Sequence, residues 1–86
     1  MERAIERYEQ ALAIARVIGA ASTERSAEWT AARDNEGLWL GNLGLAYYNL
    51  GQADRAREYL KHALAIFEEI KSLYAEQARR QLAKLG

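Results

Sequence analysis

The most continuously apolar stretch of the chain runs from Leu38 to Gly51. Wound as a helix, it places apolar side chains on two faces. Leu40, Leu43, Tyr47 and Leu50 make one face, and Leu38, Leu45 and Tyr48 lie largely on the other. A helix that is apolar on most sides is normally buried between other elements, and this one is too short to span a membrane. The stretch therefore predicts a central helix, ended by Gly51, with other helices packed on both sides.

The segment before this stretch mixes alanines and charges with one tryptophan, so its structure has two interpretations. Ser22 or Thr23 can cap the start of a helix. A continuous helix over residues 23–50 is the favoured interpretation, and it would be about 42 Å long at 1.5 Å per residue. The alternative is a break near Asp34-Asn35, which leaves a short helix and a second one of ordinary length.

Three further amphipathic helices are predicted at residues 2–18, 53–71 and 74–85. The first carries apolar residues at helical spacing, namely Ile5, Tyr8, Leu12 and Ala15. Gly19 is expected to end it, because glycine readily takes the left-handed conformation after a helix. The last helix has one apolar and one charged side, as a terminal cap of a helical stack requires. We predict one all-α domain over residues 1–86, an antiparallel array of about four helices.

Composition and charge narrow the classes of partner and of chemistry. Lys and Arg together number 12 and Asp and Glu also 12, so the net charge is zero. Nucleic-acid binders usually show a basic excess, so no nucleic-acid partner is predicted. The absence of cysteine excludes disulfides and thiol chemistry, and the absence of proline favours helices. Charges in the first six residues interrupt the apolar core that a signal peptide needs, so a cytoplasmic location without a membrane partner is expected.

An internal repeat relates the first predicted helix to the third. Eight residues between positions 3 and 18 recur 52 positions later, beginning with Arg3 and Arg55. The repeated residues are Arg3, Ala4, Glu6, Ala11, Leu12, Ala13, Ile14 and Ile18. The apolar members match in register, which indicates two copies of one structural unit rather than a chance similarity of alanine-rich helices.

Residues 38–70 resemble a tetratricopeptide repeat, a helix–turn–helix unit with the pattern W-x2-L-G-x2-Y followed by A-x3-F. Leu40 stands at the Trp position, Leu43-Gly44 match the Leu-Gly pair and Tyr47 matches the Tyr. In the second helix the matching residues are Ala56, Leu60, Ala63 and Leu64. Gly44 and Ala56 are small enough for the two helices to pack closely. The resemblance implies one complete repeat at 38–71, half of an earlier repeat at 2–18, whose own first helix is missing, and a capping helix at 74–85.

The resemblance also implies a binding surface. Leu38, Asn42, Leu45 and Asn49 share one helical stripe, with Tyr48 beside it. In the family, this side of the first helix lines a concave groove that binds peptides, and side-chain amides hold the peptide backbone. The family's charged carboxylate-clamp residues have no match on this stripe. We therefore expect a peptide or protein segment as ligand, and the alternative is that the two asparagines are buried and satisfied within the fold.

A second hypothesis is a self-associating scaffold, either natural or an engineered fragment, without a ligand of its own. The first helix has more apolar surface than one neighbour can cover, so a homodimer is expected, formed by exchange of that helix between two copies. The residues assigned to this contact are Ile5, Tyr8, Leu12 and Trp29. Trp39 fits either a core position or a partner contact.

Candidate chemistry is sparse. His62 is the only histidine and lies on a polar helix side without a catalytic partner in sequence. Glu68 and Glu69 are adjacent on a helix and do not face each other. Gly41 and Gly44 fall inside a helix, so they are interpreted as packing glycines rather than a phosphate loop. We predict no enzymatic activity, no cofactor and no metal.

Overall fold

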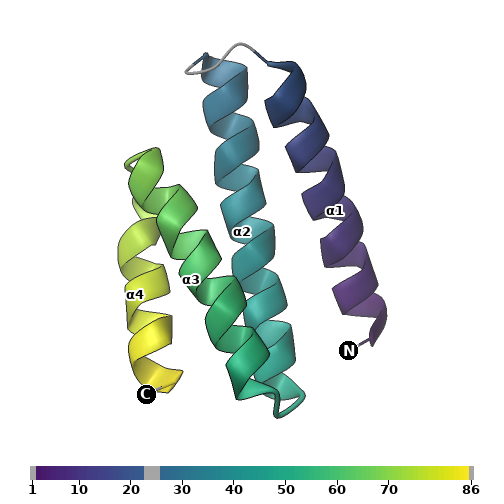
Figure 1. Ribbon diagram of the computed structural model, residues 1–86, viewed down its shortest axis with the longest axis vertical. Coiled ribbons are helices and arrows are strands. Elements are labelled where there is room, and N and C mark those ends of the chain that lie inside the picture. Colours follow the sequence, from purple (N-terminus) through teal and green to yellow (C-terminus); the bar gives the residue numbers. More distant parts are fainter. Residues whose placement is uncertain (1, 23–25, 86) are drawn as a thin grey trace.

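The computed structural model describes residues 2–22 and 26–85 of the 86-residue chain. It contains four helices, α1 (Glu2–Ala21), α2 (Ala27–Asn49), α3 (Ala53–Glu69) and α4 (Tyr74–Leu85), with no strand among the described residues. Each helix runs antiparallel to the one before it (Figure 1). The prediction of an all-α array of four helices is confirmed.

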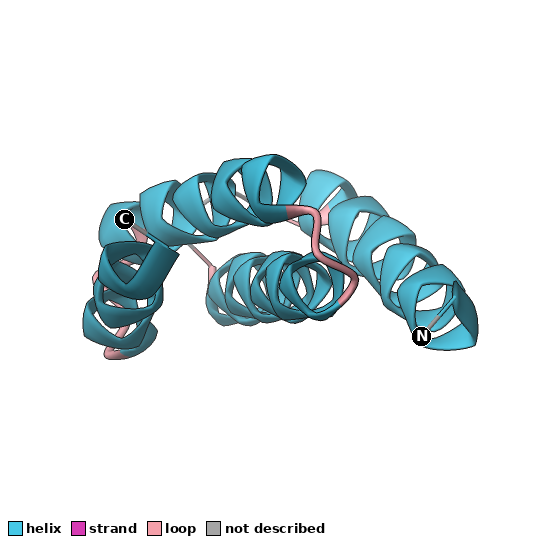
Figure 2. Ribbon diagram, turned by 90° about the horizontal axis from the view of Figure 1, so that it is seen from below, coloured by secondary structure: helices cyan, strands magenta, loops and turns pink. Residues whose placement is uncertain are grey.

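Helices that follow each other in the sequence also pack on each other, as α1 with α2, α2 with α3 and α3 with α4. Seen end-on, α1, α3 and α4 form an arc and α2 lies inside it (Figure 2). The central position predicted for α2 is therefore confirmed. The largest fully buried side chains of the described residues are Leu40 and Leu43 of α2 and Leu60 and Ile66 of α3.

The continuous interpretation of α2 is confirmed, because the helix passes through Asp34 and Asn35 without a break. Its start differs from the expected residue 23. Ser26 caps the helix by accepting a hydrogen bond from the Trp29 amide at 3.1 Å. Of the two predicted caps, Ser22 instead lies at the end of α1, and Thr23 lies outside the described residues. At the far end, Gly51 has a φ of +79°, so its expected role in ending α2 is confirmed.

The expected end of α1 at residue 18 is wrong. α1 continues through Gly19 to Ala21, and Gly19 keeps a helical backbone. The end is stabilised one turn later, where the Ser22 hydroxyl donates to the Ile18 carbonyl at 2.7 Å. Alanines 20 and 21 favour the extra turn. A Cβ on Gly19 would lie 3.6 Å from the Ala32 Cβ, an ordinary contact distance, so the packing of α1 on α2 does not require a glycine at this position.

The turn between α3 and α4 contains a residue with positive φ and is stabilised by hydrogen bonds of Ser72. α3 ends at Glu69, two residues before the expected Lys71, because Lys71 itself takes a φ of +56°. The following Ser72 amide donates to the Phe67 carbonyl at 2.8 Å, and its hydroxyl donates to the Asp34 carboxylate of α2 at 3.0 Å. This contact fixes the start of α4 against α2 and sets the direction in which α4 leaves the turn.

Candidate functional site

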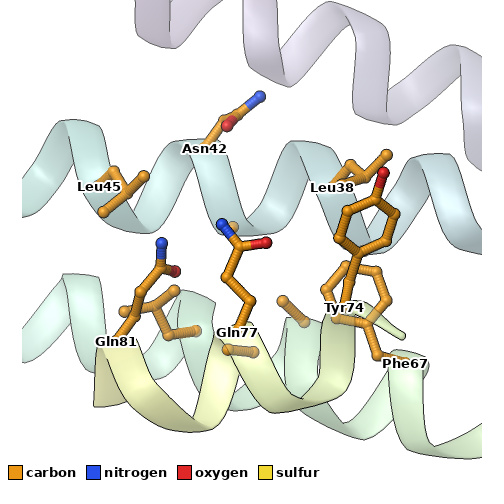
Figure 3. Close-up of a pocket in the computed structure, with 12 residues that line it drawn as sticks. Leu38, Asn42, Leu45, Phe67, Tyr74, Gln77 and Gln81 are labelled. Carbon is orange, nitrogen blue, oxygen red and sulfur yellow. The ribbon is translucent and has the colours of Figure 1, made fainter. Parts of the chain in front are cut away.

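A groove runs between α2 and α4, with α3 beneath it (Figure 3). We call it the α2–α4 groove. It is lined by Gly37, Leu38, Gly41, Asn42 and Leu45 of α2, Leu60, Ala63 and Phe67 of α3, and Tyr74, Gln77, Ala78 and Gln81 of α4. The cavity between these walls measures about 70 Å³ and is open to solvent. An opening of this size accommodates one side chain of a partner segment rather than an enclosed small molecule.

Gly41 forms the opening on the α2 side. A Cβ built on Gly41 would meet nothing within 4 Å, so its missing side chain is not required by packing. The prediction that Gly41 is a packing glycine is wrong. Its neighbours one turn away behave differently, since a Cβ on Gly37 would meet the Phe67 ring and one on Gly44 would meet Leu60. Gly41 therefore leaves room in the groove, whereas Gly37 and Gly44 allow close packing of α3.

The lining of the groove is neutral. Its polar groups are the amides of Asn42, Gln77 and Gln81 and the hydroxyl of Tyr74, beside aliphatic and aromatic side chains. Gln77 projects from α4 toward α2 between the other labelled side chains (Figure 3). Side-chain amides carry both donors and acceptors, so the groove can pair with a peptide backbone without selecting a charge.

A comparison with known protein families matches residues 38–70, which comprise the second half of α2 and all of α3. The family is the tetratricopeptide repeat, and the match covers these residues. Searches of curated proteins and of solved structures returned no match. Tetratricopeptide repeats generally mediate protein–protein interactions and are typically non-catalytic. In this chain, the repeat is extended at its start by the first half of α2, residues 27–37.

The repeat brings three of the five predicted ligand-binding residues into the groove. Leu38, Asn42 and Leu45 line it along α2. Tyr48 and Asn49 lie beyond its end, at the last turn of α2, and both are exposed. The α4 wall, with Tyr74, Gln77 and Gln81, was not predicted. The alternation of apolar and charged residues along α4 predicts which side of the helix packs on α3. It does not predict that the neighbouring side, with the residues of this wall, faces α2.

A second hollow adjoins the groove at Tyr74. It is lined by Ala27, Thr30, Ala31, Asp34, Ile70, Lys71, Ser72, Leu73 and Tyr74. Leu73 is 96% exposed, and the Tyr74 ring contacts the Phe67 ring at a centroid distance of 5.6 Å. Together, the two hollows are lined by α2 residues from its first turn to Leu45.

The residues predicted to mediate self-association lie elsewhere than expected. Ile5 and Leu12 are buried, and the Tyr8 ring contacts the Trp39 ring of α2 at a centroid distance of 5.7 Å, so all three contact their own chain. The expected exchange of the first helix between two copies is wrong for this structure, because α1 packs along α2 of its own chain. Trp29 is half-buried beside the Arg33 guanidinium, 5.9 Å from its ring centre. Trp39 belongs to the packing around the core.

A buried carboxylate joins three helices near Trp29. Glu36 of α2 is 5% exposed and accepts hydrogen bonds from Arg16 of α1 at 3.1 Å and from Arg33 at 2.8 Å. Arg33 also pairs with Glu69 of α3 at 3.0 Å. Carboxylates are rarely buried without such partners. The two arginines therefore explain the burial of Glu36, and the cluster positions α1 and α3 against the first half of α2.

Tyr47 and Tyr59 stack between α2 and α3, with ring centres 5.3 Å apart and an interplanar angle of 4°. Burial raises the pKa of Tyr59 above its ordinary value, and the nearby Tyr47 hydroxyl and Glu9 carboxylate raise it further. Each of these effects disfavours the phenolate. Tyr59 is thus held in its neutral form, as suits a packing residue.

The remaining candidate residues lie apart from the groove. His62 is exposed, and Glu68 is paired with Arg79 at 2.8 Å while Glu69 is paired with Arg33. Over residues 2–22 and 26–85, no group of three or more His, Cys, Asp or Glu side chains is placed to hold a metal ion. Within the same residues, none of the helices combines the length and hydropathy needed to cross a membrane.

Proposed function

We propose that this chain is a non-catalytic protein-interaction module that binds a peptide or protein segment in the α2–α4 groove. The observation that carries the proposal is the open space above Gly41, between an α2 wall with Leu38 and Leu45 and an α4 wall with Gln77 and Gln81. An apolar side chain of the ligand fits between the leucines, while the amides pair with its backbone. The general role of tetratricopeptide repeats supports this assignment.

A substitution at Gly41 tests this proposal. A leucine at position 41 fills the groove, and because nothing lies within 4 Å of its Cβ the fold accepts it. A display library of random peptides is selected against the parent chain, with counter-selection against Gly41→Leu. The enriched peptides should bind the parent, bind Gly41→Leu at least tenfold more weakly and shift the amide resonances of Asn42, Gln77 and Gln81.

The predicted asparagine contacts are tested with the same peptides. Asn42→Ala should weaken binding without changing the melting temperature, whereas Asn49→Ala serves as the control because Asn49 lies beyond the groove. A large loss of stability in Asn42→Ala would instead assign Asn42 a structural role. Peptides that bind Gly41→Leu and the parent equally would contradict the groove as the site.

A further inference from the structure

α1 lies at one edge of the fold and has one covered and one open side (Figure 1). Ile5, Leu12 and Ala15 cover the side that faces α2. On the other side, Ile14 is 61%, Val17 67% and Ile18 48% exposed. We call Ile14, Val17 and Ile18 the α1 stripe. Three aliphatic side chains at helical spacing on one solvent-facing side are typical of a surface that packs on another helix.

The internal repeat relates positions on the open side of α1 to positions of α3 whose burial is known. The offset of 52 residues relates Ile14 to Ile66 and Ala11 to Ala63 of α3. Ile66 is 2% and Ala63 0% exposed, because they lie in the core of the complete repeat. Ile18 relates in the same way to the half-buried Ile70, and Val17 to the exposed Glu69. Ile14, at the start of the α1 stripe, therefore has the residue type of a core position, but in this chain it is open.

Charge along α1 favours a second copy in the antiparallel direction. Arg3 and Arg7 precede Ile14 by eleven and seven residues, which places them on the same side of the helix, in its first half. The last turn of α1 contains no basic residue. Two antiparallel copies bring stripe against stripe and Arg7 of each copy to the carbonyl end of the other helix, where a positive charge is favourable. A parallel pair would instead place arginine beside arginine.

The opposite edge of the fold does not offer an alternative surface for the stripe. The outer side of α4 is charged, with ion pairs Arg79–Glu68 and Arg80–Glu76. Head-to-tail contact of α1 with α4 of another copy would cover these charges. We propose that the chain forms a two-fold symmetric dimer through antiparallel contact of the α1 stripe with the same stripe of a second copy. The α2–α4 groove lies away from α1 and stays open in this dimer, so the proposal is independent of the groove ligand.

Light scattering of the parent chain, from low micromolar to several hundred micromolar, tests the proposal. The parent should change from monomer to dimer within this range. Ile14→Glu should raise the dissociation constant roughly 100- to 10,000-fold, because the two-fold symmetric contact loses one buried isoleucine from each copy. Leu73→Glu is the matched control, because Leu73 is even more exposed and lies on the turn before α4. It should dimerise like the parent, and Arg7→Glu should weaken the dimer more than Lys84→Glu does.

Because the chain has no cysteine, single-cysteine variants give a second measurement that does not depend on dimer strength. Gln10 lies on the stripe side of α1 one turn before Ile14, and in a stripe-on-stripe contact it comes opposite Ala21 of the other copy. Mixed Gln10→Cys and Ala21→Cys chains should therefore form a cross-linked heterodimer under mild oxidation, and Leu73→Cys should not cross-link. A parent chain that stays monomeric over the whole range would overturn the proposal. So would an Ile14→Glu variant with unchanged association, or cross-linking of Leu73→Cys as efficient as that of the Gln10/Ala21 pair.

Discussion

Gly37 of α2 lies directly against the ring of Phe67 of α3, so that a Cβ built on Gly37 would come within 2.5 Å of the ring Cε1. The ring is 4% exposed and contacts the Tyr74 ring at a centroid distance of 5.6 Å, so a side chain at position 37 must displace packed rings. We predict that Gly37→Ala destabilises the fold by about 1–3 kcal/mol, the usual cost of overpacking. Chemical denaturation followed by circular dichroism measures this directly.

Gly41→Ala is the matched comparison, because both glycines lie in the middle of the same helix. A Cβ on Gly41 meets nothing, so the alanine should gain about 1 kcal/mol of helix propensity. The two variants should therefore change stability in opposite directions. Equal effects in both would show that the contact with Phe67 relaxes without cost.

The contact of Gly44 with the second helix of the repeat gives another prediction. A Cβ on Gly44 would lie 2.8 Å from the Leu60 Cγ and 3.2 Å from the Ala56 carbonyl oxygen, which confirms the close helix contact expected from the sequence. A backbone oxygen cannot move aside as a side chain can. Gly44→Leu should cost about 1–3 kcal/mol and lower the melting temperature by about 4–8 °C per kcal/mol. A variant that melts at the parent's temperature would disprove the contact.

Glu36 is predicted to stabilise the fold through its charge. Glu36→Gln keeps the size of the side chain but loses the charge-assisted bonds to Arg16 and Arg33, at a cost of about 1.5–3 kcal/mol. The exposed pair Glu76–Arg80 is the control, since Glu76→Gln should change stability by less than about 1 kcal/mol. Urea denaturation of the two variants at low salt distinguishes them. Equal losses would mean that the Glu36 cluster has no special role.

The raised pKa of Tyr59 predicts a loss of stability in alkaline solution. The unfolded chain ionises this phenol near its ordinary pKa of about 10, whereas the folded chain holds the proton to higher pH. The folded state thus binds more protons above pH ~10, and stability falls as pH rises through the folded pKa. Tyr59→Phe should lack this component, so its stability relative to the parent should be constant below pH ~9 and increase above pH ~10. A constant difference across this range would contradict the assignment.

Periodicity predicted the number and order of the helices because each has an apolar side at helical spacing. The exact ends were less predictable. Gly19 and Gly51 look equivalent in the sequence, yet Gly51 takes a φ of +79° after α2, whereas Gly19 keeps a helical backbone and α1 continues to Ala21. A glycine permits a helix end but does not require one. Where α1 ends depends on the residues that follow Gly19, the helix-favouring alanines and the Ser22 hydroxyl.

The sequence predicted the α2 wall of the candidate site but not its α4 wall. Leu38, Asn42 and Leu45 follow from the helical stripe of α2, whereas the residues of α4 enter the groove only through the angle at which α4 leaves its turn. The α1 helix shows a similar limit. It has two apolar sides, and the sequence alone does not show that Leu12 is the buried one and Ile14 the exposed one. That choice depends on the packing of α1 on α2.

The arrangement of neighbours also has a kinetic consequence. Each helix packs mainly on the helix before or after it, so no extensive contact joins distant parts of the described chain. Folding then requires closure of short loops only, and the entropy lost before the first stabilising contacts form is small. Helical proteins with such low contact order fold in microseconds to milliseconds. The same arrangement that leaves a side of α1 without a neighbour therefore favours rapid folding.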